Sequence, residues 1–128
     1  MTRKRVFKTK TFAKWMYKNN LCGNDLLNAV KEMEHGLIDA DLGSSLYKKR
    51  IALPGGGKSS GARVIIASRL LRRWFFIFGF AKNEKSNINK DEQLYLQETA
   101  KRLLNLADRE IDIAISDGEL KELKIHDK

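Results

Sequence analysis

The feature that most constrains this chain is an uninterrupted apolar run from Trp74 to Ala81. Side chains of a strand alternate between its two faces. Here both sets are apolar, with Trp74, Phe76, Phe78 and Phe80 in one and Phe75, Ile77 and Gly79 in the other. A strand that is apolar on both faces is buried on both, so the run predicts a central strand. Core packing is favoured over a platform on which nucleic-acid bases stack. The run is also far shorter than the roughly 20 residues of a membrane-spanning helix.

Other segments predict the elements around this strand. Strand-like runs rich in β-branched and aromatic residues cover 46–53, 62–71 and 72–81, and 6–12 reads as a short edge strand followed by a helical turn or two at 12–17. Apolar residues at helical spacing after Asn24 predict a helix that ends at Gly36. Asn89 and Glu92 have capping-box spacing before a second amphipathic helix, and a third, acidic helix ends at Asp117-Gly118. Residues 120–125 form either a last short strand or a tail.

This order, β-α-α-β-β-β-α-α, predicts an α+β fold in which adjacent strands are antiparallel. The length of 128 residues suits one domain, 1–128, and is too short for two of ordinary size.

Positive charge is concentrated in the first two-thirds of the chain. Residues 1–90 contain 19 Lys and Arg against 6 Asp and Glu, a net charge of +13, whereas residues 91–128 contain 6 against 10, a net charge of −4. The segment 48–85 holds ten basic residues and a single acid, Glu84. Such a field attracts a polyanion, with nucleic acid the first candidate and an acidic protein the second.

Strand periodicity indicates where these cations meet. Lys48 and Arg50 are two residues apart and so share a face, and Arg63 and Arg69 share a parity on the next run. Cross-strand pairing would gather three or four cations on one face, where like charges repel unless an anionic ligand binds. The alternative is that they flank acidic groups of the C-terminal helices.

Several kinds of site are not supported. Cys22 has no partner for a disulfide, which suits a reducing cytoplasm, and with His35 and His126 it does not form a set of zinc ligands. The Gly57-Lys58-Ser59 sequence lacks the first glycine of a phosphate-binding loop and precedes a strand rather than a helix. We therefore expect no cofactor and no metal.

The middle of the chain resembles the RelE/HigB-like toxin family of bacterial type II toxin-antitoxin systems. Four segments carry the resemblance: MEHGLIDADLG at 33–43, KKRIA at 48–52, GGGKSSGAR at 55–63 and FGFAKNE at 78–84. It implies a small antiparallel sheet flanked by helices, acting as a cytoplasmic mRNA interferase. Such a toxin cuts messenger RNA, commonly on the ribosome, and is inhibited by a cognate antitoxin. The basic positions of the family fall on Lys48, Arg50, Lys58, Arg63 and Lys82.

These residues suit metal-free RNA cleavage, in which the 2′-hydroxyl attacks the adjacent phosphate. Arg63 is expected to bind the phosphate through its planar donors, and Lys48, Lys58 or Lys82 to transfer protons, with Glu84 as an alternative base. Other basic residues of the segment are expected to contact RNA: Lys49, Arg50, Arg69 and Lys85. Two other functions stay open, a non-catalytic RNA- or protein-binding module and a gyrase-directed toxin of the ParE type. We also expect an antitoxin to cover the basic region with an acidic or amphipathic segment. A helix-turn-helix DNA-binding domain in this antitoxin is one option.

Overall fold

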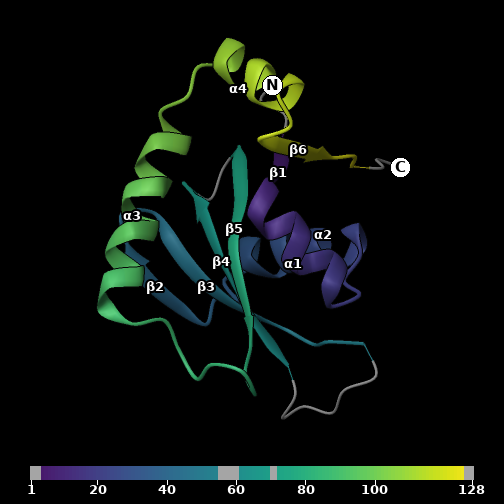
Figure 1. The fold of residues 1–128 in the computed structure, drawn as a ribbon, viewed down its shortest axis with the longest axis vertical. Coiled ribbons are helices and arrows are strands. Elements are labelled where there is room, and N and C mark those ends of the chain that lie inside the picture. The colour runs from purple at the N-terminus through teal and green to yellow at the C-terminus, as the bar shows by residue number, and fades with distance from the viewer. Residues whose placement is uncertain (1–3, 55–60, 70–71, 126–128) are drawn as a thin grey trace.

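The computed structural model describes residues 4–54, 61–69 and 72–125, and its chain forms four helices and six strands within these ranges (Figure 1). The order confirms the α+β class. In chain order the elements are β1 (Arg5–Thr9), α1 (Lys10–Lys18), α2 (Gly23–Glu34), β2 (Ala40–Gly43), β3 (Leu46–Ile51), β4 (Ala62–Ser68), β5 (Arg73–Ala81), α3 (Lys90–Leu104), α4 (Asp108–Ser116) and β6 (Leu120–Leu123).

The strands form one mixed sheet in the order β2-β3-β4-β5-β1-β6. Neighbouring strands are antiparallel, except that β1 runs parallel to β5. The prediction of an edge strand near the N-terminus is wrong, because β6 pairs with the outer side of β1. Strand β2 was not predicted, since its four residues, Ala40–Gly43, contain no β-branched or aromatic side chain that would identify a strand.

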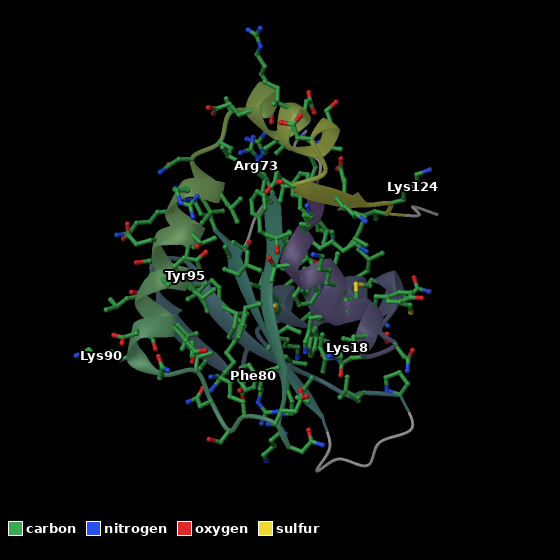
Figure 2. All side chains as sticks on the ribbon, in the orientation of Figure 1. Lys18, Arg73, Phe80, Lys90, Tyr95 and Lys124 are labelled. Carbon is green, nitrogen blue, oxygen red and sulfur yellow. The ribbon has the colours of Figure 1, made fainter. Side chains whose placement is uncertain are left out.

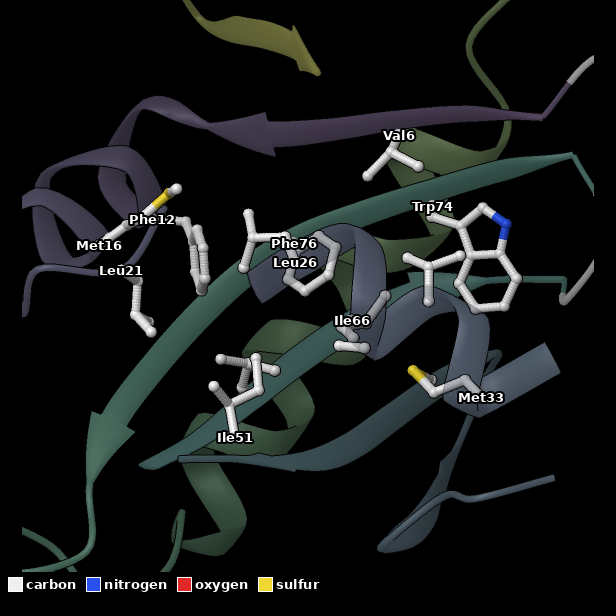
Figure 3. Packing of buried hydrophobic residues seen from close by; sticks show 13 residues of the cluster. Val6, Phe12, Met16, Leu21, Leu26, Met33, Ile51, Ile66, Trp74 and Phe76 are labelled. Carbon is white, nitrogen blue, oxygen red and sulfur yellow. The ribbon is translucent and has the colours of Figure 1, made fainter. Parts of the chain in front are cut away.

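Helices cover both faces of this sheet (Figure 1). One face, here called the α1/α2 face, packs a core that includes Phe12, Leu26, Ile66 and Trp74 (Figure 3). The opposite face, the α3 face, packs a second core. It includes Phe7, Leu46, Ile65, Phe75, Leu96 and Ala100. The prediction of a central strand apolar on both faces is confirmed for β5, since consecutive residues Trp74 and Phe75 enter different cores.

A β-bulge in β5 changes which side chains share a face. Ile65 pairs with Phe78 but the next residue, Ile66, pairs with Phe76, so Ile77 is the extra residue. Beyond the bulge Phe78 and Phe80 turn to the α3 face, and the expectation that they share a face with Phe76 is wrong.

Gly79, on the α1/α2 face, lies against the Trp15 ring of α1. A Cβ atom there would be 2.5 Å from two of the ring atoms. Only glycine therefore allows α1 to lie this close to β5.

The predicted helix ends are largely confirmed. Asn89 and Glu92 each accept a hydrogen bond of 2.8 Å from the other's backbone N–H, which closes the capping box of α3. Helix α2 begins slightly earlier than expected, with Cys22 at the N-cap, and it ends where Gly36 adopts a φ of 89°. This turn directs the chain toward β3, where the Asp39 N–H donates to the Lys48 carbonyl at 2.9 Å. Among the described residues, no helix is long and apolar enough to cross a membrane.

Candidate functional site

Three of the predicted site residues lie together on adjacent strands. Arg50 of β3 pairs directly with Arg63 of β4, and Lys48 precedes Arg50 by two residues. Lys48 and Arg50 share a strand face with Leu46, and Arg63 shares a strand face with Ile65. The Leu46 and Ile65 side chains enter the core of the α3 face, so the three cations lie on that face of the sheet. We call Lys48, Arg50 and Arg63 the cation cluster.

The cluster lies at one end of the sheet. Arg63 pairs with Phe80, and Figure 2 shows Phe80 and Arg73 toward opposite ends of β5. The backbone N–H of Lys82 donates to the Gly61 carbonyl at 3.0 Å, so the turn after β5 lies at the same end as Arg63. Lys82 and Glu84 are both exposed in this turn.

An acid that the sequence analysis missed, Asp39, lies among the three cations. Its carboxylate is 3.3 Å from Arg63 Nε, 3.8 Å from Lys48 Nζ and 3.8 Å from an Arg50 terminal nitrogen. The partner of the cluster thus comes from the connection between α2 and β2, and not from the C-terminal helices. One feature of the sequence could have indicated Asp39 as a partner of the cations: Asp39 and Asp41 are the only acids between Glu34 and Glu84.

The members of the site differ in their access to solvent. The Arg63 and Lys48 side chains are 15% and 17% exposed, Asp39 is 22% exposed, and Arg50 is 66% exposed. Lys48 Nζ also donates to Asn87 Oδ1 at 3.4 Å. Three cations and one carboxylate leave a net charge of +2, which suits a phosphate diester and the extra charge that develops on it during displacement.

An open cleft of about 450 Å³ adjoins the cluster. It is lined by residues 36–39, from the end of α2 to Asp39, together with Lys49 and Arg50. Asp39 and Arg50 therefore belong both to the cluster and to the wall of a space that a ligand can enter.

Two other predicted RNA-binding residues lie apart from the cluster. Lys49 faces α2, where its ammonium lies 2.8 Å from the Glu32 carboxylate and its side chain is only 10% exposed. Arg69 follows the far end of β4 and donates to the Leu104 carbonyl of α3 at 3.2 Å. Both side chains have partners within the protein fold.

Lys85, also predicted to bind RNA, pairs with an acid of a C-terminal helix. Its Nζ lies 2.8 Å from Glu92 of α3. The hydrogen bond from Lys85, followed by that from the Asn89 backbone, lowers the pKa of Glu92 below its ordinary value. Lys58 lies outside the described residues.

Metal ligands are not clustered in the described parts of the chain, where no group of three His, Cys, Asp or Glu could hold an ion. His35 is an exposed helix-end residue whose Nδ1 lies 2.8 Å from the Lys31 carbonyl. The described side chains of the cation cluster and Asp39 supply guanidinium, ammonium and carboxylate groups.

Residues 4–123 match the family model described as the RelE toxin of the RelE/RelB toxin-antitoxin system. This match, over nearly the whole chain, gives the class of protein: a toxin of a toxin-antitoxin system. The chain belongs to the RelE toxin family. Membership implies a cognate antitoxin of the RelB kind as its partner. No curated protein gives a significant match.

Proposed function

We propose that the protein is an endoribonuclease that cleaves messenger RNA on the ribosome and thereby stops translation. The observation that carries this proposal is the cation cluster, in which three cations converge from two adjacent strands beside an open cleft. Family membership supports the same function. Because ribosomes translate in the cytoplasm, the reaction is proposed to take place there.

The proposed reaction uses the RNA's own nucleophile. The 2′-hydroxyl attacks the adjacent phosphorus, and the products end in a 2′,3′-cyclic phosphate and a 5′-hydroxyl. Arg63 suits the phosphate because its fixed charge and planar donors match two phosphate oxygens. Arg50, the most exposed member of the cluster, is placed to meet the RNA backbone first.

Protons are proposed to move through lysine side chains. Lys48 is the described lysine within the cluster, and Lys58 and Lys82 remain candidates for the same role. Cations of the protein would neutralise the charge on phosphorus, so the reaction is proposed to need no metal ion.

The test is cleavage of a defined message on ribosomes, with fragment ends identified by end-specific ligation. Arg63→Ala is expected to reduce the rate by on the order of 10²-fold, as for loss of one group that stabilises the charge of a transition state. Arg72→Ala is the matched control, because this exposed arginine immediately precedes the opposite end of β5. Products with 5′-phosphate ends would contradict the mechanism.

The same experiment separates the other functions. RNA binding without products would indicate a non-catalytic module, and DNA damage with intact messages would indicate a gyrase-directed toxin.

We further propose that the antitoxin inhibits by covering the cation cluster with an acidic or amphipathic segment. Opposite charges would speed the encounter, while apolar burial would set the lifetime of the complex. A helix-turn-helix domain in the antitoxin, which would bind DNA, is compatible with this arrangement.

A further inference from the structure

We propose that Asp39 is the catalytic base that removes the proton from the attacking 2′-hydroxyl. The proposal rests on the proposed RNA cleavage, and it adds a residue that the family resemblance did not place in the site. Its basis is the position of Asp39 within ion-pair distance of all three members of the cation cluster.

The Asp39 carboxylate differs in its hydrogen bonding from the acids in the first turns of helices. Asp25, Glu92 and Glu110 each accept a backbone N–H at 2.7–2.9 Å. The contacts of Asp39 with described side chains are looser ion pairs of 3.3–3.8 Å. Lone pairs of its oxygens are therefore available to a substrate hydroxyl, while the surrounding cations hold the phosphate next to it.

The position of Asp39 is also fixed and accessible. Its backbone N–H is bonded to the Lys48 carbonyl of β3, so the carboxylate is carried by the sheet edge rather than by a free loop. At 22% exposure it is open to the cleft of about 450 Å³ that it lines with Arg50. A base needs this combination of fixed geometry and access to the proton it removes.

Glu84, the base considered from the sequence, lacks these contacts. It lies exposed in the turn after β5, and the described side chains include no ion-pair partner for it. Asp39 is the better candidate because a base must lie within hydrogen-bond reach of the group that it deprotonates.

The step balances as follows. The 2′-O–H bond breaks, the proton passes to an Asp39 carboxylate oxygen, and the electron pair of that bond forms the new O–P bond. The P–O5′ bond breaks, and its electron pair leaves with the 5′-oxygen, which takes a proton from the Lys48 ammonium. Asp39 then returns its proton to solvent and Lys48 regains one, so the site is restored without net consumption.

The experiment compares Asp39→Asn with Asp41→Asn, which makes the same change of charge two residues away. Single-turnover cleavage of a ribosome-bound message is measured at one pH near neutrality. Asp39→Asn is expected to lower the rate by roughly 10²–10⁴-fold. Binding of a 2′-deoxy message should stay equal or become tighter, because a negative charge has been removed beside the cluster. Asp41→Asn should stay within about threefold of the unmodified protein.

Affinity for the 2′-deoxy message separates a base from a residue that only orients others. The charged groups facing Asp39 from β3 and β4 are Lys48, Arg50 and Arg63. If Asp39 only held these cations in place, its replacement would weaken binding of the 2′-deoxy message together with the rate. Asp39→Glu, which keeps a carboxylate, should regain part of the rate, and it serves if Asp39→Asn does not fold.

Two outcomes would overturn the assignment of Asp39 while leaving RNA cleavage in place. One is cleavage by folded Asp39→Asn within about threefold of the unmodified protein. The other is a reduced rate accompanied by equally weakened binding of the 2′-deoxy message, which would make Asp39 a positioning residue. Products of the unmodified protein with 5′-phosphate ends would instead overturn the proposed reaction, and the role of Asp39 with it.

Discussion

Two adjacent lysines of β3 provide a sharp test of which side of the sheet carries the function. Lys48 belongs to the cation cluster on the α3 face, whereas Lys49 points to the α1/α2 face and pairs with Glu32. We expect Lys48→Met to reduce RNA cleavage strongly. Lys49 also lines the cleft, but its ammonium is paired with Glu32, so Lys49→Met should reduce cleavage per folded molecule much less. Methionine keeps most of the apolar stem of either lysine and removes only the charge.

The cost of Lys49→Met in stability follows from its surroundings. Unit charges 2.8 Å apart attract by about 6 kcal/mol at an effective dielectric constant near 20, and by about 1.5 kcal/mol in bulk water. The Glu32 side chain is 53% exposed, so it remains hydrated when Lys49 is replaced. Removal of the nearly buried ammonium also removes its desolvation cost. We therefore expect a net loss of about 1 kcal/mol, or about 4 °C in melting temperature.

For Lys48→Met we expect the opposite result, a small change in stability and a large loss of activity. Asp39 keeps its contacts with Arg50 and Arg63, and repulsion within the cluster decreases, so the free energy of unfolding should change by less than about 1 kcal/mol. Cleavage should fall by on the order of 10-fold or more, since a charge beside the phosphate is lost.

The assay is ribosome-dependent cleavage at equal amounts of folded protein, with urea unfolding for stability. If Lys49→Met reduced cleavage as much as Lys48→Met did, the assignment of function to the α3 face would be refuted.

The other predictions concern packing, pH and the partner. Gly79→Ala places a Cβ atom against the Trp15 ring and should cost about 1–3 kcal/mol in urea unfolding; an unchanged midpoint would contradict this close contact. Burial, and then the charge of Lys121, lower the pKa of Lys8, so the folded protein binds fewer protons than the unfolded chain and stability should rise as pH increases toward 10.5. Lys8→Met should remove that rise and raise stability at neutral pH, as thermal melts would measure. Hydrogen exchange of the antitoxin complex should show protection of β3 and β4; protection confined to residues 91–125 would refute occlusion of the cluster.

Local patterns of the sequence were sufficient for most elements. The capping box of α3 needs only two residues three positions apart, and the end of α2 needs only the positive φ that Gly36 allows. The shared face of Lys48 and Arg50 follows from strand alternation alone. Each of these features is decided by neighbours a few residues apart, which is why the sequence predicts it.

Long-range pairing decided what the sequence left open. The chain places β1 between β5 and β6, although 63 or more residues lie between it and either partner strand. One extra residue in β5 moves Phe78 and Phe80 to the other face, and no pattern in the neighbouring sequence predicts this bulge.

The candidate site likewise depends partly on local sequence and partly on long-range contacts. Sequence alone determined that this chain is basic, that its fold is α+β, and that cations two residues apart on a strand share a face. Only the tertiary structure placed Asp39 among those cations, separated Lys49 from Lys48, and carried Arg69 to the opposite end of β4. The physical reason is that strand register and the packing of the connection after α2 determine these distances, and both depend on contacts between segments far apart in the chain.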